Sequence, residues 1–433
     1  MVMHVYFSGI GGAGITPMAL LAKQAGFDVS GSDKQDSRNL NYLKDHGITD
    51  VHVGQSREHI ERTHAQKPID WLVYSSALPL EQPDAPELRF CEEKGIKATK
   101  RDQFLSHLVE SKNLKMIAVA GTHGKTTTTA MAVWLFKQLG IPISYNVAAK
   151  ISFGETSQLD PDSEYFIYEA DEFDRNFLAF HPHLSIITGI DWDHPDIYPT
   201  REIYYNAFRE YLGRSEHTVM WNADVARLEL LQNQNRLTLN EEDPEIDKKL
   251  HLAGRVNRLD AWQVAHAVKQ LTGKPLEELL EIMNRFPGVG RRFEQIIPNL
   301  ITDYAHTVPK IQGALQKAEE VAEGNVVVVY EGLHNTRQHF IKDDLKHLFE
   351  GVKKLYIVPS YLAREDPDLP LLKPEDLKQF LDETTQLRAE PAALDDKLRD
   401  NIQKHLDDGD LVLCITAGGG GSLNEWLHQQ FEA

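Results

Sequence analysis

Short runs of apolar residues alternate with longer amphipathic stretches along almost the whole chain. Residues 3–33, MHVYFSGIGGAGITPMALLAKQAGFDVSGSD, predict a strand, a glycine-rich turn, a helix and a second strand. Six further segments begin with an apolar run of this kind: 116–140, 184–196, 300–311, 325–340, 354–362 and 410–427. This βαβ rhythm is typical of parallel sheets covered by helices, so the sequence predicts an α/β fold.

Two polar stretches divide the pattern into three parts. VESKNLK (109–115) precedes an apolar strand, and FPGVGRRFE (286–294) combines proline, glycine and charge after a helical pattern. We therefore expect three α/β domains, at residues 1–111, 112–288 and 289–433. The acidic stretch NEEDPEIDKK (240–249) is expected to be a solvated loop inside the middle domain.

Charge and cysteine content narrow the class of protein. The 433 residues carry a net charge of −19, which disfavours nucleic acid as a partner because phosphate neutralisation needs clustered Lys and Arg. Only Cys91 and Cys414 are present, so a disulfide framework is excluded and a reducing compartment is favoured. Neither a signal peptide nor an apolar run of membrane-spanning length is evident, so we expect a cytoplasmic protein without a membrane segment.

The first glycine turn has the spacing of a diphosphate-binding loop. Gly9, Gly11 and Gly14 fit G-x-G-x-x-G directly after a strand, and Asp33 ends the second strand about 20 residues later. Glycines let the backbone approach a diphosphate, and the following helix N-terminus favours negative charge. The motif suits either a nicotinamide dinucleotide or a nucleotide sugar, and these alternatives stay open at this point.

A second loop, AGTHGKTTTTA (120–130), resembles a P-loop that has been shortened. Gly124, Lys125 and Thr126 stand as in a P-loop, but Gly121 is only three residues before Gly124. Backbone N–H groups of such a loop would hold the β- and γ-phosphates of ATP. Lys125 would add a positive charge, and the hydroxyl of Thr126 or Thr127 would ligate Mg²⁺.

Acidic residues follow the next two strands. YFIYEADEFD (165–174) ends a strand in carboxylates, and Glu169 is the first candidate for a magnesium ligand. LSIITGIDWDHPD (184–196) ends in acids and His194, a candidate second metal ligand. Asp171, Glu172 and Asp174 could equally form a solvated turn.

Strands of the last third also end in polar or glycine residues. Asp303, His306, Arg337 and the Gly418–Gly421 loop would gather at the carboxyl edge of a third sheet, where α/β proteins bind ligands.

Taken together, these motifs resemble the Mur ligase family of ATP-dependent, amide-forming enzymes. GTHGKTTTT, EADEFD, the D-x-D-H block, GRRF and DYAHT occur in the family's order and spacing across the whole chain. GIGGAG and SSALP (75–79) resemble the branch that adds alanine.

The resemblance implies a Rossmann-like domain for the UDP of a nucleotide sugar, a central ATP domain and a closing Rossmann-like domain that admits the amine. It implies ATP and Mg²⁺ as cofactors, peptidoglycan precursor synthesis as the process, and a monomer or homodimer in the cytoplasm. Its small-molecule substrates would be UDP-N-acetylmuramate and L-alanine, joined through an acyl phosphate.

The residues that the resemblance assigns fall into four groups. The ATP site would comprise Gly121, Thr122, His123, Gly124, Lys125, Thr126, Thr127, Asn257 (adenine), Arg292 (phosphates) and Asp303 (ribose). One Mg²⁺ would bind Thr126 and Glu169, and the second His194. The sugar nucleotide would contact Gly9, Gly11, Gly12, Gly14, Asp33 and Ser76. The amine would meet His334 and Arg337, and Tyr304 or His306 would orient or deprotonate it.

Some positions depart from the family's pattern. Asp260 replaces a usual Asn, and YEGLHNTRQ (330–338) has His334 and Arg337 where the alanine-adding branch has two arginines. YEGLHNTRQ and DHPDIYP (193–199) resemble the branch that adds the preformed tripeptide L-Ala-γ-D-Glu-meso-diaminopimelate. We favour L-alanine as the amine, with this peptide as the alternative.

Two other classes of function fit part of the chain. A nicotinamide oxidoreductase would use the first glycine loop but would leave the P-loop unexplained. A P-loop switch without ligase chemistry would leave the first glycine loop unused.

Overall fold

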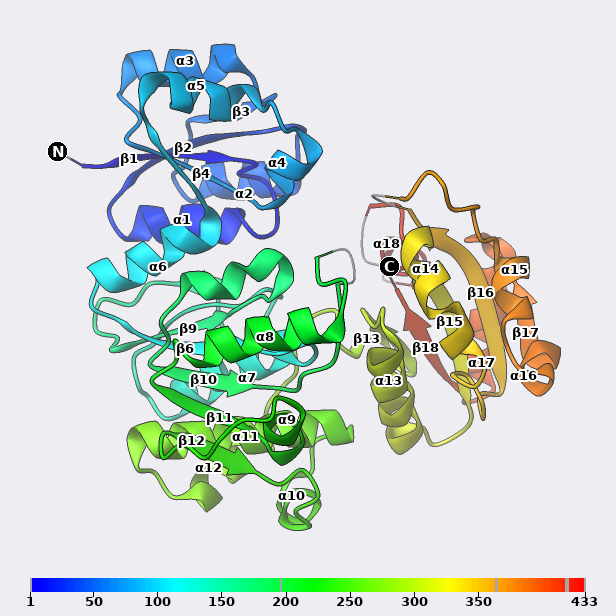
Figure 1. The fold of residues 1–433 in the computed structure, drawn as a ribbon. Helices are drawn as coiled ribbons and strands as arrows, with labels where there is room; N and C mark the ends of the chain where they lie inside the picture. The colour runs from blue at the N-terminus through cyan, green and yellow to red at the C-terminus, as the bar shows by residue number, and fades with distance from the viewer. Residues whose placement is uncertain (1, 195–196, 363–364, 417–419, 432–433) are drawn as a thin grey trace. The chain divides into compact units, whose positions relative to one another are not determined.

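The computed structural model describes residues 2–194, 197–362, 365–416 and 420–431, and it contains three mainly parallel sheets (Figure 1). The expected α/β fold is confirmed, and each sheet lies within one of the three predicted domains. By compactness the chain forms two units. Unit 1 comprises Met1–Ala148, Phe153–Asp243 and Asp260–Met283, and unit 2 comprises Ala149–Ser152, Pro244–Leu259 and Asn284–Ala433. The boundaries at 111/112 and 288/289 therefore stay predictions.

The first sheet of unit 1 has the strand order β3-β2-β1-β4-β5, and all neighbours are parallel. Its order reverses beside β1, and ligands bind α/β sheets at such a switch point. The strands are β1 (His4–Ser8), β2 (Asp28–Asp33), β3 (Val51–Val53), β4 (Trp71–Tyr74) and β5 (Lys97–Lys100). The helices are α1 (Thr16–Gln24), α2 (Arg38–Asp45), α3 (Arg57–Gln66), α4 (Ala77–Glu81), α5 (Pro86–Lys94) and α6 (Arg101–Ser111).

The second sheet of unit 1 has the order β12-β11-β10-β6-β9-β7-β8, parallel except for the β7–β8 pair. Because β6 lies between β10 and β9, the loops that follow these three strands meet at one edge. The strands are β6 (Lys115–Ala120), β7 (Ser144–Asn146), β8 (Ser157–Gln158), β9 (Tyr165–Glu169), β10 (Leu184–Ile187), β11 (His217–Trp221) and β12 (Arg236–Leu239). The helices are α7 (Lys125–Gln138), η1 (Phe173–Ala179), α8 (Arg201–Leu212), α9 (Asn222–Arg227), α11 (Arg255–Thr272) and α12 (Leu276–Met283), and the first turn of α11 belongs to unit 2.

One apolar core runs through unit 1 from the first sheet to the second. Helix α6 contributes Phe104, which packs edge-on against Phe7 of β1 (ring centroids 5.4 Å apart) and Trp71 of β4 (5.1 Å). The same core includes Met116 of β6 and Phe166 of β9. Large buried aromatic rings of this kind dominate core stability, so the two sheets of unit 1 are joined by packing as well as by the chain.

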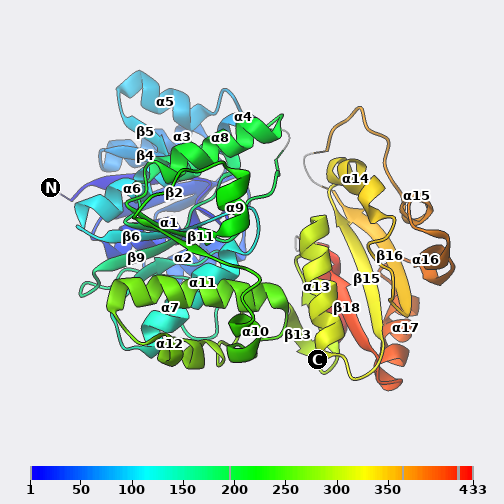
Figure 2. The same cartoon turned by 60° about the horizontal axis from the view of Figure 1, so that its bottom comes forward.

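Unit 2 contains a third sheet with the order β13-β14-β18-β15-β16-β17 (Figure 2). Only β13 and β14 pair antiparallel. The strands are β13 (Glu294–Ile297), β14 (Leu300–Asp303), β15 (Val326–Leu333), β16 (Lys354–Tyr361), β17 (Ala389–Pro391) and β18 (Leu411–Ile415). The helices are α10 (Glu245–Lys249), α13 (Val308–Val321), α14 (Asn335–Ile341), η2 (Lys342–Leu345), α15 (Pro374–Gln379), α16 (Glu383–Arg388), α17 (Asp396–Asp407) and α18 (Leu423–Phe431).

The prediction that 240–249 forms a solvated loop is wrong in part. Glu245–Lys249 forms α10, because Ile246 is buried and Asp247 pairs with Arg255 and Arg258 at the start of α11. A single apolar residue anchors this helix, which is too weak a periodic signal to detect in the sequence.

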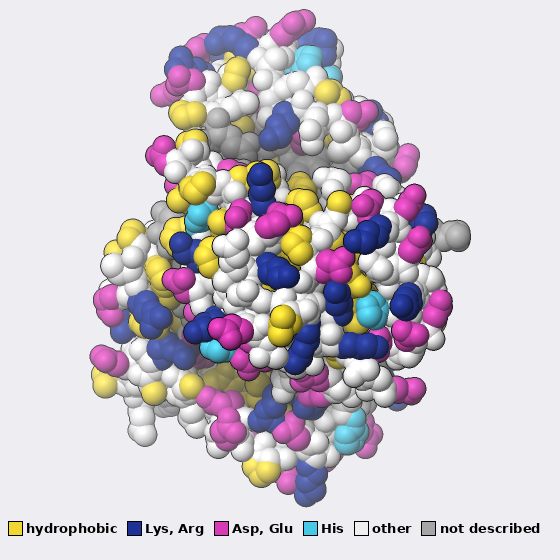
Figure 3. Space-filling model, turned by 90° about the vertical axis from the view of Figure 1, so that its right-hand side faces the viewer, with side chains coloured by type: hydrophobic (Ala, Val, Ile, Leu, Met, Phe, Trp, Pro, Cys, Tyr) yellow, Lys and Arg dark blue, Asp and Glu magenta, His cyan; other side chains and the backbone are white. Residues whose placement is uncertain are grey.

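On the face drawn in Figure 3, basic and acidic side chains are interspersed instead of being separated by sign. Among the described residues, none of the helices combines the length and the apolar character that crossing a bilayer requires.

Candidate active site

The first glycine loop leaves β1 at the switch point of the first sheet. Gly9 has φ +76°, a conformation that favours glycine, and the N–H of Gly11 donates to Oδ2 of Asp33 over 2.9 Å. A Cβ added to Gly14 would lie 1.8 Å from Nη1 of Arg101, so the arginine packs directly on this glycine. Asp33 therefore holds the loop in shape, and its predicted contact with the substrate stays a prediction.

The shortened P-loop joins the central strand β6 to helix α7. Gly121 has φ +140° and Gly124 has φ +78°, so both turn the chain in ways that favour glycine. A Cβ on Gly121 would lie 2.3 Å from Oγ1 of Thr188 on the neighbouring strand end. Thr122 fixes the loop from the side, because its hydroxyl donates to the carbonyl of Asp191 (2.7 Å). The loop thus ends at the N-terminus of α7, whose free N–H groups favour phosphate.

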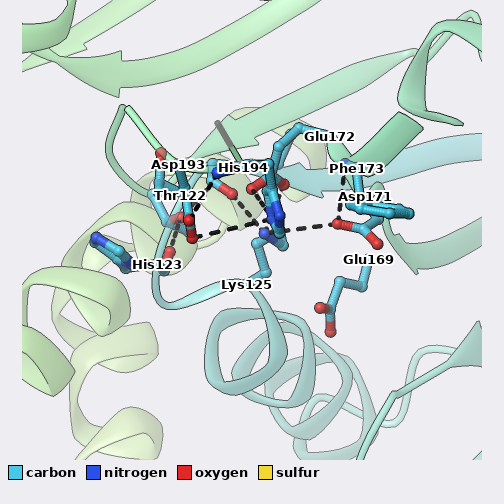
Figure 4. Close-up of polar contacts among 12 residues, drawn as sticks. Thr122, His123, Lys125, Glu169, Asp171, Glu172, Phe173, Asp193 and His194 are labelled. Atoms are coloured by element: carbon cyan, nitrogen blue, oxygen red, sulfur yellow. Dashed lines mark hydrogen bonds and ion pairs between the residues drawn. The ribbon is translucent and has the colours of Figure 1, made fainter. Parts of the chain in front are cut away.

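Lys125 is held by carboxylates at the carboxyl edge of the second sheet (Figure 4). Its Nζ lies 2.6 Å from Oε2 of Glu172, 3.9 Å from Oδ1 of Asp171 and 2.7 Å from the carbonyl of Gly121. Burial raises the pKa of Glu172 to about 7, although Lys125 opposes the shift. Burial also acts against the charge of Lys125, but the surrounding carboxylates outweigh it and raise the pKa of this ammonium. Lys125 is therefore a fixed positive charge beside the loop.

Of the predicted magnesium ligands, Glu169 and His194 lie near Lys125 (Figure 4), and Thr126 follows Lys125 in α7. The hydroxyl of Thr126 donates to Oε2 of Glu169 over 2.8 Å, and Nε2 of His194 lies 3.8 Å from Oε1 of Glu172. A hydroxyl and a carboxylate beside a phosphate-binding loop are hard oxygen donors of the kind that Mg²⁺ prefers. These residues therefore fit the magnesium that the motifs predict.

Asp260 lies beneath the P-loop and is 3% exposed. A Cβ on Gly124 would lie 3.0 Å from Oδ1 of Asp260, and Oδ2 of Asp260 and Oγ1 of Thr128 both have no hydrogen-bond partner of good geometry. Burial raises the pKa of Asp260 well above its ordinary range, and the Thr128 hydroxyl opposes this only in part. Burial beneath the loop therefore favours the protonated form of this carboxyl group.

In unit 2, cationic side chains gather around Tyr304 and His306, just after β14. The guanidinium groups of Arg291 and Arg292 lie 4.8 and 5.1 Å from the centre of the Tyr304 ring. The rings of Tyr304 and His306 are 4.8 Å apart, and Nζ of Lys310 lies 3.4 Å from Nε2 of His306. Nearby, Asp303 is committed to the backbone, because its Oδ2 accepts from the N–H of Phe293 (2.7 Å).

The remaining predicted residues of unit 2 lie at the ends of other elements. His334 has φ +58° between β15 and α14, and its Nδ1 is 3.6 Å from Oε1 of Glu365. Arg337 follows on α14, and Asn257 of α11 donates to the carbonyl of Ala253 (2.8 Å). Residues 417–419 of the predicted Gly418–Gly421 loop and residues 195–196 of the DHPDIYP block lie outside the described residues.

Two family models match the chain, and relatives match nearly all of it. The models described as "Mur ligase family, catalytic domain" and "Mur ligase middle domain" match residues 4–113 and 119–266. The UDP-N-acetylmuramate–L-alanine ligase of Clavibacter michiganensis is 30% identical over 84% of this chain and 80% of its own length. This chain belongs to the Mur ligase family. The corresponding ligase of Clostridium acetobutylicum is 28% identical over 97% of this Mur ligase and 96% of its own length.

Solved structures share the fold of this Mur ligase. UDP-N-acetylmuramate-alanine ligase from Thermotoga maritima has a TM-score of 0.73 at 22% identity, with 99% of this chain and 98% of that chain covered. A murein peptide ligase from Psychrobacter arcticus has a TM-score of 0.64 at 20% identity, with the same coverage of 99% and 98%.

Within unit 1 of the Mur ligase, the structure brings together most residues predicted for ATP and metal. Lys125 and His194 both lie beside Glu172, and Thr126, the next residue in α7, donates to Glu169. Glu172 is the main residue of this group that the sequence does not single out, because the acidic run is equally typical of a solvated turn. Its full burial depends on how the chain folds back after β9, and the acidic run alone carries no signal that separates Glu172 from its neighbours.

The structure also shows how the first sheet approaches the acidic segment of the second. The predicted substrate residue Ser76 donates to Oδ1 of Asn176 (3.0 Å), and Lys100 pairs with Asp174. These contacts join the two sheets of unit 1 through Asp174 and Asn176.

Proposed function

We propose that this Mur ligase joins the carboxylate of UDP-N-acetylmuramate to the amine of L-alanine, with cleavage of ATP to ADP and phosphate. Relatives named UDP-N-acetylmuramate–L-alanine ligase that align with 84–99% of the chain carry this proposal. The P-loop and the first glycine loop in one unit support it, because the reaction needs a nucleotide triphosphate and a sugar nucleotide together. The two buried free cysteines agree with a reducing compartment such as the cytoplasm.

In the first half-reaction, the γ-phosphoryl group passes to the muramoyl carboxylate, and ADP leaves. This transfer depends mainly on positioning and on neutralisation of charge. Lys125, which is held by Glu172 and the Gly121 carbonyl, would meet the phosphates at the start of α7. Thr126 and Glu169 would hold one Mg²⁺ and His194 a second, and the bound metal would neutralise phosphate charge.

In the second half-reaction, the amine nitrogen bonds to the acyl carbon and the carbon–oxygen bond to phosphate breaks. The nitrogen must also lose a proton, and His306 is the candidate that accepts it. Arg337 would bind the carboxylate of the amino acid, because a guanidinium pairs well with a carboxylate. Asn257, Arg292 and Asp303 would contact ATP, and Gly9, Gly11, Gly12, Gly14, Asp33 and Ser76 the sugar nucleotide.

An amine screen tests the proposal. ADP release would be measured with ATP, Mg²⁺ and UDP-N-acetylmuramate, together with L-alanine, glycine, L-serine or L-Ala-γ-D-Glu-meso-diaminopimelate. We expect release that requires both the sugar nucleotide and L-alanine, and a product whose mass is that of UDP-N-acetylmuramoyl-L-alanine. Turnover with the tripeptide alone would overturn the proposal and identify a peptide-adding ligase. Turnover without any amine would indicate a nucleotide hydrolase.

A further inference from the structure

Two cations from different helices act on His306 in unit 2. Lys310 lies in the first turn of α13, and its Nζ is 3.4 Å from Nε2 of His306. Arg337 lies on α14, and its charge acts on the same imidazole, as does that of Arg292. The sequence singled out His306 and Arg337, but the role of Lys310 emerges only from the structure.

These contacts define the state of His306. Burial first, and then the charges of Lys310, Arg337 and Arg292, lower the pKa of His306 well below its ordinary value. The imidazole is therefore neutral. Because an ammonium can only donate, Nε2 must accept from Lys310, and Nδ1 then carries the proton and donates to the carbonyl of Tyr304 (3.2 Å). The nitrogen that could act as a base is thus engaged by Lys310.

Two carboxylates lie near the cations of this cluster. Asp303 accepts from the Phe293 N–H, and its charge also acts on Arg292 and Lys310. Glu365 accepts from the N–H of Thr336 (2.9 Å) and pairs with His334. Arg291 lies over the ring of Tyr304 with Arg292. The charges that act on His306 itself are those of Lys310, Arg337 and Arg292, and a cationic setting of this kind suits an anionic group of the substrate.

We propose that Lys310, together with Arg337, binds the carboxylate of the incoming amino acid, and that this contact releases Nε2 of His306 to accept the proton of the amine. The inference rests on the proposed function and deepens it. In an α-amino acid one carbon separates amine and carboxylate, so the base and the cation must be close neighbours, as His306 and Lys310 are. As the new carbon–nitrogen bond forms, the proton moves from nitrogen to Nε2, and phosphate leaves with the electron pair of the broken carbon–oxygen bond.

The proposal also distinguishes classes of amine. In L-Ala-γ-D-Glu-meso-diaminopimelate the carboxyl group beside the reacting amine is part of a peptide bond and is uncharged. Such a peptide offers Lys310 no carboxylate at this position, so Lys310 would keep its contact with Nε2 of His306. An α-amino acid with a free carboxylate is therefore the class of substrate that this pair selects.

Kinetic comparison of Lys310→Met, Lys310→Arg and the exposed control Lys404→Met tests the contact. For Lys310→Met we expect the KM for L-alanine to rise on the order of 10- to 100-fold, the range of a hydrogen bond to a charged group. The KM values for ATP and UDP-N-acetylmuramate should stay within about twofold, since the change would remove only the carboxylate contact. Lys310→Arg should restore most of the affinity, and Lys404→Met should resemble the wild type.

The pH profile separates this role from a structural one. In the free enzyme Lys310 acts on His306, so without Lys310 the pKa of His306 rises toward its ordinary value. The acid limb of kcat/KM for L-alanine, which reports the free enzyme, should therefore move to higher pH in Lys310→Met and stay in place in Lys310→Arg. An unchanged KM for L-alanine together with an unchanged acid limb would overturn the proposal. Thermal midpoints of the variants show whether a loss of activity reflects unfolding instead.

A titration without turnover separates this inference from the proposed function. The ε1 resonance of His306, assigned with His306→Gln, would be followed with UDP-N-acetylmuramate and an ATP analogue that cannot transfer phosphate. L-Alanine should raise the pKa of His306 in the wild type but not in Lys310→Met, and alaninamide should have no effect in either. If this shift is seen and no ligation occurs, the proposed function fails and the inference stands. If ligation of L-alanine occurs and the shift is absent, only the inference fails.

Discussion

At the scale of single residues, the site depends on carboxyl groups that burial has made unusual. Glu172 is fully buried beside Lys125, and Asp260 is buried beneath the P-loop. Taking a carboxylate out of water is costly unless it is paired or protonated. Glu172 is paired with Lys125, whereas burial raises the pKa of Asp260 and favours its protonated form, so two similar residues near one loop meet the cost of burial in different ways.

Glu169→Gln should raise the Mg²⁺ concentration that half-maximal activity requires. An amide is a poorer ligand for a hard cation than a carboxylate, and Glu169 lies 2.8 Å from the Thr126 hydroxyl. We expect a shift of about tenfold or more, which is the range seen when groups around a metal are lost. Activity measured against Mg²⁺ concentration checks this, with Glu164→Gln, at the exposed residue just before β9, as the control. Equal Mg²⁺ dependence of Glu169→Gln and wild type would argue against Glu169 as a ligand.

Asp260→Asn should stabilise the protein at alkaline pH. The folded-state pKa of Asp260 is raised above that of the unfolded chain, so above pH 4 the unfolded state releases a proton that the folded state keeps. The free energy of unfolding of the wild type therefore falls as the pH rises, and an amide removes this fall. Urea denaturation at pH 5 and pH 8 should show a larger advantage of Asp260→Asn at pH 8. If the stability advantage of Asp260→Asn over the wild type shrank as the pH rises, the raised pKa of Asp260 would be contradicted.

At the scale of elements, the loops that join strands to helices set the site. The P-loop between β6 and α7 is short because Gly121 and Gly124 both turn with positive φ. Strands β9 and β10 flank β6 and place Glu169 and His194 at the same edge. Parallel neighbours guarantee that these strand ends meet, which is why the alternating pattern was informative.

Gly121→Ala should abolish ATP binding and lower the free energy of unfolding by about 1–3 kcal/mol. The new Cβ would lie 2.3 Å from Oγ1 of Thr188 and 2.9 Å from the carbonyl of Gly189, at a φ of +140°. Gly95→Ala is the matched control, because Gly95 also has positive φ but open space around it. ATP titration calorimetry and urea denaturation would measure both effects. Normal ATP affinity in Gly121→Ala would show that the compressed turn is dispensable.

His266 in α11 should make the protein less stable in mild acid. Burial first, and then Lys269, lower the pKa of His266 to about 4, against about 6.5 in the unfolded chain. As the pH falls from 6.5 to 4, the unfolded state binds a proton that the folded state does not, so the free energy of unfolding decreases. At 1.36 kcal/mol per pH unit the full difference corresponds to about 3.4 kcal/mol, which solvent screening of the half-buried ring should reduce to about 2–3 kcal/mol. In His266→Gln the free energy of unfolding should lack this decrease when it is measured between pH 4 and 7. The same pH dependence in His266→Gln and the wild type would contradict the prediction.

At the scale of the whole molecule, the two nucleotide loops lie on different sheets of unit 1. The first glycine loop follows β1 of one sheet, and the P-loop follows β6 of the other. Each loop leads to the N-terminus of its own helix, so each loop can bind phosphates independently of the other loop. Residues 174–176 join the sheets by contacts that involve neither loop directly.

Lys125→Ala should therefore abolish ligation while UDP-N-acetylmuramate binding stays within about twofold. Loss of a charge contact in phosphoryl-transfer enzymes costs on the order of 10³–10⁵ in rate. Calorimetry with the sugar nucleotide, and ADP release, would measure the two properties. Lys115→Ala, at the exposed start of β6, is the control. Loss of sugar-nucleotide binding in Lys125→Ala alone would show that the two sites are not separate.

Local patterns in the sequence determined the α/β fold, the two glycine loops, Lys125, Glu169 and the strand ends that carry Asp303 and His306, because periodicity and motif spacing are local properties of the chain. Only the tertiary structure decided which of the acids after β9 is buried against Lys125, that Asp260 lies beneath Gly124, and that Lys310 reaches His306. Each of these facts depends on packing between segments and on the water that packing removes. Helix α10 escaped prediction for the same reason, since one buried isoleucine anchors it. Burial sets the charge state of an ionisable group, and burial is a property of the folded chain.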